Sequence, residues 1–199
     1  MLTALILSAV LTELGSRWID FLYRMPTAPL TFPDEISSRA RFRKPLLAVL
    51  MFAGFFSVQE IYLGAAVFFL ALITATDFEQ YVIFDRMLLP FALAGILAAA
   101  YLGLPLGERF LAAALGGGIF LLIALVSRGG IGGGDIKLMA TLGLWLGAET
   151  LLNVVIAACI GGGIVAVALI LAGKKNRTDY FAYGPYFALA AMYFLCTAV

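Results

Sequence analysis

Eight apolar runs divide the chain, and short polar segments separate them. The runs cover residues 2–23, 45–58, 61–77, 87–104, 109–127, 136–148, 151–173 and 183–199. A helix needs roughly 20 apolar residues to cross a hydrocarbon core about 30 Å thick, and fewer where flanking polar groups reach the interface. The pattern therefore predicts an all-α, polytopic membrane protein with about eight transmembrane helices, of which the second and sixth are short.

The charged residues between the runs alternate in sign from one connection to the next. Connections on one side carry most of the basic residues, namely Arg24, Arg39, Arg41, Arg43, Lys44, Arg86, Arg128, Lys174, Lys175 and Arg177. Connections on the other side carry Glu60, Glu108 with Arg109, and Glu149. Lys and Arg are enriched in cytoplasmic loops, so the first side is predicted to be cytoplasmic and both termini to lie outside.

The composition agrees with a membrane protein and excludes some kinds of catalytic and metal site. The 199 residues are 63% hydrophobic and 13% charged, whereas a soluble domain has about 25% charged residues. There is no histidine, and Cys159 and Cys196 form no CxxC pair. The sequence thus excludes histidine-based triads and imidazole metal ligands, and it gives no support for nucleic-acid binding. We expect one integral-membrane domain over residues 1–199, with residues 25–44 as a short cytoplasmic loop within it.

Two aspartates lie at the ends of apolar runs, where a carboxylate is costly. Asp77 ends the run IYLGAAVFFLALITAT, and Asp135 separates a glycine-rich segment from the run IKLMATLGLWLG. Both are predicted at cytoplasmic helix ends, and an ionisable side chain at membrane depth is by default a functional candidate. Asp135 also suits an ordinary helix start, where it caps free N–H groups, whereas Asp77 at a helix C-terminus opposes the helix dipole.

The two aspartates together predict acid–base chemistry. Two carboxylates that face one another can share a proton, so that one acts as a general base on water and the other as a general acid. The glycines before Asp135 have no side chains and let backbone or substrate approach its carboxylate, although the same glycines also fit a flexible turn. The chain has no GxxxxGK[ST] motif, which excludes a P-loop.

Four segments of the sequence resemble the bacterial type IV prepilin leader peptidases, a family of membrane aspartyl proteases with a GxGD motif. They are GSRWIDFLYRMP at 15–26, TDFEQYVIFDRMLLP at 76–90, GGGDIKLMATLGLWLG at 132–147 and FAYGPYFALAA at 181–191. They occur in the same order as in the family and span most of the chain.

The resemblance implies roles for individual positions. Asp77 and Asp135 match the catalytic dyad of the family. The matching motif residues around Asp135 are Gly132, Gly134 and Lys137, and the possible substrate-binding acids are Glu79 and Asp85. Phe84 stands where the family usually has a proline, which puts the turn before Asp85 in question.

The resemblance also implies an activity and a location. It implies an aspartic endopeptidase of the bacterial inner membrane that removes the basic leader of a prepilin or pseudopilin at the cytoplasmic boundary of the lipid bilayer. It implies neither a metal nor a cofactor for this cleavage. Many members carry two CxxC pairs in the first cytoplasmic loop and also N-methylate the product. The loop here has no cysteine, so methylation, with S-adenosylmethionine as the methyl donor, is left open.

Two other functions remain open from the sequence. A presenilin-like intramembrane protease shares the paired aspartates but cuts within helices, and the other matching segments favour the prepilin type. A cation transporter also places aspartates at membrane depth, where they bind the ion, and it needs no particular glycine pattern.

Overall fold

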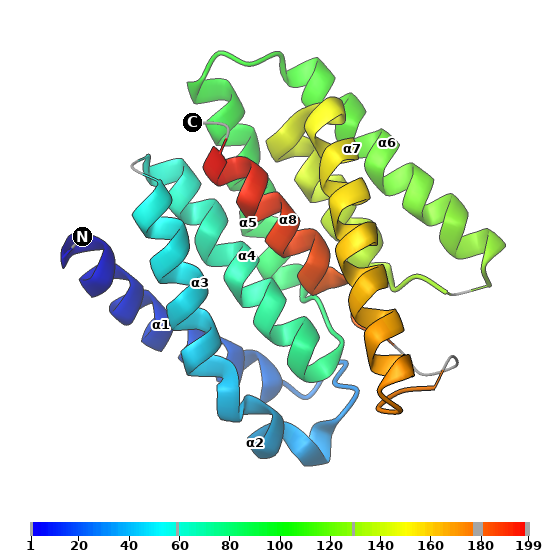
Figure 1. Cartoon of the computed structure of the whole chain (residues 1–199). Coiled ribbons are helices and arrows are strands. Elements are labelled where there is room, and N and C mark those ends of the chain that lie inside the picture. Colours follow the sequence, from blue (N-terminus) through cyan, green and yellow to red (C-terminus); the bar gives the residue numbers. More distant parts are fainter. Residues whose placement is uncertain (1, 59, 129, 177–180, 198–199) are drawn as a thin grey trace.

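The protein is a bundle of helices (Figure 1), and its computed structural model describes residues 2–58, 60–128, 130–176 and 181–197. Within these ranges there is no strand. The helices are α1 (Leu2–Tyr23), α2 (Ile36–Arg39), α3 (Arg43–Ser57), α4 (Ile61–Gln80), α5 (Asp85–Tyr101), α6 (Leu106–Val126), α7 (Gly133–Leu171) and α8 (Gly184–Thr197). Two 3-10 turns, η1 (Pro33–Glu35) and η2 (Ala40–Phe42), flank α2.

The apolar runs of the sequence correspond to these helices. The all-α prediction is confirmed for the described residues, and the runs at 136–148 and 151–173 both lie within α7. Helices α1, α4, α6 and α7 are long and apolar enough to cross a membrane. Helices α3, α5 and α8 are shorter, with 15, 17 and 14 residues. The prediction of eight membrane spans with both termini outside stays a prediction.

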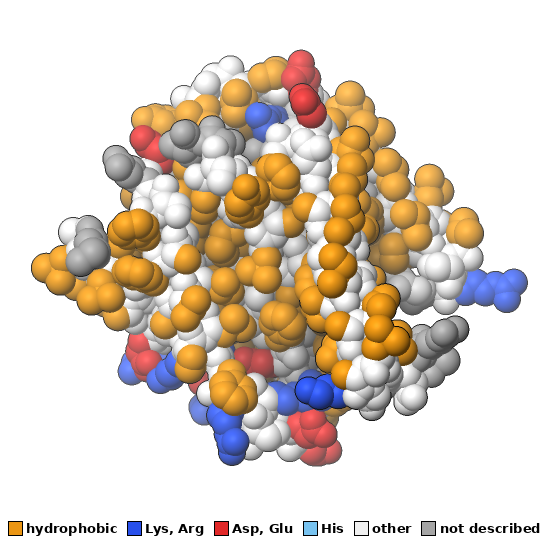
Figure 2. All heavy atoms as spheres, viewed as in Figure 1, with side chains coloured by type: hydrophobic (Ala, Val, Ile, Leu, Met, Phe, Trp, Pro, Cys, Tyr) orange, Lys and Arg blue, Asp and Glu red, His pale blue; other side chains and the backbone are white. Residues whose placement is uncertain are grey.

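Helix α4 lies at the centre of the bundle. From Leu70 to Gln80 every residue except Phe78 is buried. Helices α3, α5 and α8 pack around α4, while α6 packs along α7 on one side of the bundle (Figure 1). Apolar side chains cover the middle of the face in Figure 2, and charged side chains gather toward its two ends. This distribution is the one expected of a surface that faces lipid.

Helix α7 is broken at Gly147, which has φ 74° and ψ 177°. Essentially only glycine adopts this conformation. Arg109 donates a hydrogen bond from Nη1 to the carbonyl of Trp145 at 2.8 Å, so a carbonyl next to the break has a partner. The two halves of α7 run in opposite directions, because Asp135 at its start and Lys175 after its end both lie near Tyr81. The prediction of two helices in this region is confirmed, with the break at Gly147.

We expect Gly147→Ala to destabilise the fold by about 1–3 kcal/mol, because an L-residue is strained in this conformation. The added Cβ would also lie 3.3 Å from Arg109 Nη1. Thermal unfolding of the detergent-solubilised protein measures the effect. Gly118→Ala in α6 is the matched control, since its Cβ meets nothing within 4 Å and alanine is the better helix former. Equal stability of Gly147→Ala and the wild type would contradict the assignment of the break.

Candidate active site

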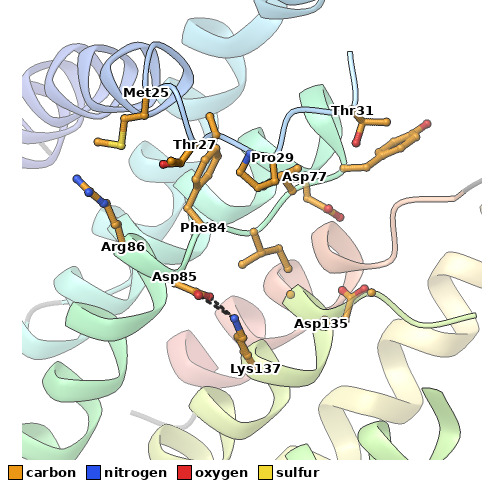
Figure 3. A pocket seen from close by; sticks show the side chains of 17 residues that line it. Met25, Thr27, Pro29, Thr31, Asp77, Phe84, Asp85, Arg86, Asp135 and Lys137 are labelled. Atoms are coloured by element: carbon orange, nitrogen blue, oxygen red, sulfur yellow. Dashed lines mark hydrogen bonds and ion pairs between the residues drawn. The ribbon is translucent and has the colours of Figure 1, made fainter. Parts of the chain in front are cut away.

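A pocket of about 600 Å³ opens where α4 ends and where α5 and α7 begin. Asp77 comes from the last turn of α4 and Asp135 from the first turn of α7, and both line this pocket. Figure 3 shows the two side chains reaching the same space from different helices. Residues that lie 58 positions apart in the sequence are therefore brought to one pocket.

Both aspartates present a carboxylate oxygen that the fold leaves without a partner. Asp77 is 6% exposed and Asp135 is half-buried. Asp77 Oδ2 and Asp135 Oδ1 are buried, and neither has a hydrogen-bond partner among the described residues. A buried polar atom without a partner is costly and is rare away from functional sites. These two oxygens are therefore the groups of the pocket best placed to bind water or a substrate carbonyl.

Tyr81 sets the path of the chain directly after Asp77. It adopts a left-handed conformation, with φ 54° and ψ 38°, and its N–H bonds to the carbonyl of Asp77 at 3.0 Å. A bulky residue with positive φ is uncommon and is typical of a constrained turn. This turn ends α4 and directs the following residues into the pocket, where Val82, Ile83 and Phe84 form part of the lining.

Glycines allow the helix starts to approach the two carboxylates. A Cβ on Gly184, the first residue of α8, would lie 2.6 Å from Asp77 Oδ2. A Cβ on Gly132 would lie 3.1 Å from Asp135 Oδ2, and one on Gly134 would lie 3.0 Å from the Cβ of Ile83. Ile83 also lies against Gly184, so its buried side chain fits between the first turns of α7 and α8.

Lys137 and Asp85 form an ion pair at the rim of the pocket. Lys137 Nζ lies 2.7 Å from both carboxylate oxygens of Asp85, and Figure 3 shows this link between α7 and α5. Their side chains are 57% and 58% exposed. Phe84, which precedes Asp85, has φ −80°, close to the value that proline imposes. The backbone at this position is thus compatible with a proline.

Glu79 lies outside the pocket. Two residues along a helix point about 200° apart, and Glu79 faces away from the side of α4 that carries Asp77. Arg43 donates from Nε to Glu79 Oε1 at 2.8 Å and from Nη2 to Oε2 at 2.6 Å, and the hydroxyl of Tyr23 donates to Oε2 at 3.1 Å. Of Glu79 and Asp85, the two acids predicted to bind substrate, only Asp85 lines the pocket.

One wall of the pocket comes from the segment predicted as the first cytoplasmic loop, residues 25–44. The loop after α1 contributes five lining residues, Met25, Thr27, Ala28, Pro29 and Thr31. The sequence indicated an extended cytoplasmic loop, and its prolines do restrict the backbone, but no motif pointed to contact with the dyad. Among the described residues, no group of three or more His, Cys, Asp or Glu side chains is suited to a metal ion, and a reaction without metal or cofactor stays a prediction.

A bundle containing four helices of membrane length, with two aspartates in one pocket, defines a membrane protein with a potential acid–base site. A family model of the type IV leader peptidases matches residues 64–167, which include both aspartates and more than half of the chain. The chain therefore belongs to the type IV leader peptidase family.

Several relatives carry the name prepilin leader peptidase/N-methyltransferase. The one from Aeromonas salmonicida (strain A449) is 31% identical over 130 residues, which cover 61% of this chain and 44% of the relative. Those from Bacillus subtilis (strain 168) and Escherichia coli (strain K12) are 34% and 29% identical, and the matched parts cover 49% and 57% of the relatives and 61% and 62% of this chain. The chain thus spans about half the length of the relatives it matches. No solved structure matches the chain.

The contact between Gly184 and Asp77 yields a test of the site geometry. Relatives of this chain are named prepilin leader peptidases, and for that activity we expect Gly184→Ala to lower the cleavage rate by about 100-fold, because a displacement of about 1 Å at a reacting group has an effect of that size. A cleavage assay with a purified prepilin measures the rate. Gly107→Ala, at the start of α6 and outside the pocket lining, is the matched control, since its added Cβ meets nothing within 4 Å. Similar rates for the two variants would show that the approach of α8 to Asp77 does not matter for the reaction.

Proposed function

We propose that the protein is a membrane aspartic endopeptidase that removes the basic leader from prepilin-like substrates. The observation that carries the proposal is the pair of aspartates, Asp77 and Asp135. They line one pocket, and each presents a buried oxygen without a hydrogen-bond partner in the described part of the chain. Family membership and the names of the relatives support a prepilin or pseudopilin as the substrate.

The chemistry follows from the proximity of the two carboxylates. Two acids in one poorly solvated pocket do not readily ionise together, so the pair holds one proton. The ionised carboxylate accepts a proton from a water molecule, and the resulting hydroxide adds to the scissile carbonyl carbon. The protonated carboxyl then donates its proton to the leaving amine as the C–N bond breaks. The reaction needs no covalent intermediate, metal or cofactor.

The position of the pocket agrees with cleavage at a membrane boundary. It lies at the end of α4, a helix of membrane length, and at the start of α7. A substrate whose apolar helix stays in the bilayer would therefore present the residues just outside the lipid to the dyad. The basic residues Arg86 and Lys137 line the same pocket, which supports placing it on the cytoplasmic side of the bacterial inner membrane. The proposal concerns peptide cleavage and leaves methylation aside.

The dyad is tested by replacing each aspartate with its neutral isostere. We expect Asp77→Asn and Asp135→Asn each to reduce leader removal by about 100- to 10,000-fold, because each removes one partner of the acid–base pair. The double variant should be no worse than the singles, since the two residues act as a unit. Gel analysis of a co-expressed prepilin reports cleavage.

Glu149→Gln provides the control, because Glu149 is an exposed carboxylate in the second half of α7. Near wild-type cleavage by either aspartate variant would show that the dyad is wrongly assigned. A cation transporter predicts ion flux and no leader removal, and a presenilin-like enzyme predicts a cut within the apolar helix. The identified product termini separate these alternatives from the proposal.

Asp85 is the pocket acid best placed to attract a basic leader. Its ion pair with Lys137 is exposed, and such pairs contribute about 0.2–1 kcal/mol, so a substrate cation can replace the lysine. We expect Asp85→Asn to raise KM by about two- to fivefold at low ionic strength, with a smaller effect at high salt because of screening. Glu108→Gln, which changes an exposed acid outside the pocket lining, is the control. A loss of equal size at all salt concentrations would contradict electrostatic recognition by Asp85.

A further inference from the structure

The loop after α1 is fastened to the active-site end of α4 by one buried side chain. We call residues Met25–Phe32 the strap. Gln80, the last residue of α4, is 0% exposed. Its Oε1 accepts a hydrogen bond from the backbone N–H of Phe32 at 2.8 Å, and its Nε2 donates to the carbonyl of Phe32 at 3.1 Å. One amide side chain thus satisfies both backbone groups of one strap residue.

Further contacts hold the same end of the strap. The ring of Phe32 packs edge-on against Tyr81, with 5.3 Å between the centroids. The guanidinium of Arg39 lies 3.5 Å over the ring of Phe32, and its Nη1 donates to the backbone carbonyl of Glu79 at 3.2 Å. The strap is therefore fastened to residues 79–81, which lie two to four positions after Asp77 at the end of α4.

The fastened strap lies beside the dyad. Figure 3 shows Thr27, Pro29 and Thr31 on the side of the pocket next to Asp77, while Lys137 lies on the far side. Thr27, Pro29 and Thr31 are exposed and line the pocket. The strap therefore borders the pocket that a peptide enters to reach Asp77 and Asp135.

The chemistry of Gln80 indicates more than filling of space. A buried amide is costly unless it is hydrogen-bonded, and the net gain from such bonds is modest. An apolar side chain of the same size would fill the space in α4 equally well. The amide has a further effect, because its two hydrogen bonds fix where the backbone of Phe32 lies relative to the helix.

We propose that Gln80 is a positioning residue that holds the strap at a fixed place beside Asp77, so that the strap forms the wall along which the substrate peptide binds. This inference rests on the proposed peptidase function and goes beyond it, because it assigns substrate alignment to a residue outside the dyad. Gln80 acts through the strap and does not touch the reacting atoms.

The test is Gln80→Met, which keeps the size of the side chain and removes both hydrogen bonds. We expect KM for a purified prepilin to rise about tenfold, while kcat changes less than about twofold. Hydrogen–deuterium exchange of residues 24–32 should become faster, because the strap is released. Thr74→Val is the matched control. Thr74 is also buried in α4, and its hydroxyl donates only within the helix, to the carbonyl of Leu70 at 2.8 Å.

Each other outcome overturns the inference. Faster exchange with unchanged KM would show that the strap is held for structural reasons alone. Unchanged exchange would show that Gln80 does not hold the strap. A fall in kcat at constant KM would show that the substitution disturbs Asp77 and not the alignment of the substrate. A wild-type protein that cleaves no prepilin would overturn the proposed function itself, whereas an active wild type with an unaffected Gln80→Met overturns the inference alone.

A second variant keeps the test decisive if Gln80→Met does not fold. Phe32→Ala leaves the backbone pair intact and removes the ring contacts with Tyr81 and Arg39. It should also raise KM with little change in kcat, and an unchanged KM would overturn the inference. Where both variants fold, their combined effect on KM should be smaller than the product of the single effects, because both release the same strap.

Discussion

The close approach of backbone to the Asp77 carboxylate is the constraint on which the active-site end of the bundle depends. Space beside Asp77 Oδ2 is limited to a residue without a side chain, and Gly184 meets this limit at the start of α8. The left-handed turn at Tyr81 then sends Ile83 between the first turns of α7 and α8. The positions of three helix ends are thus set by one buried acid and the turn that follows it.

A second buried acid connects the other side of the same helix end to α1 and α3. Glu79 is paired with Arg43 of α3 and Tyr23 of α1, and Arg43 also bonds to Asp20. Removing one partner of a buried ion pair costs about 3–5 kcal/mol, whereas the intact pair adds little net stability. The network therefore fixes α1, α3 and α4 relative to one another. Asp77 and Glu79 lie in the same helical turn but point in different directions. Asp77 lines the pocket, and Glu79 pairs with residues of α1 and α3.

The sequence predicted the helices well, because lipid requires long apolar runs and their boundaries are visible in one dimension. The sequence also identified Asp77 and Asp135 as candidate functional residues, because acids at the ends of such runs are unusual. The sequence did not show that Asp85 lines the pocket and Glu79 does not, because the residue that pairs with an acid can come from a distant segment. The pairing of Gln80 with Phe32 joins residues 48 positions apart, and no periodicity or motif encodes such a contact.

The absence of cysteine from the first loop gives these contacts their importance. A loop without a metal or disulfide cross-link must gain its order from packing and hydrogen bonds. Here Phe32 and Arg39 both contact residues between Glu79 and Tyr81, and Arg39 also pairs with Glu35. The order of the strap is therefore coupled to the end of α4, and so to Asp77. A change that shifts this turn moves both the acid and the wall beside it, so the catalytic group and the surface that aligns the peptide keep their relative positions.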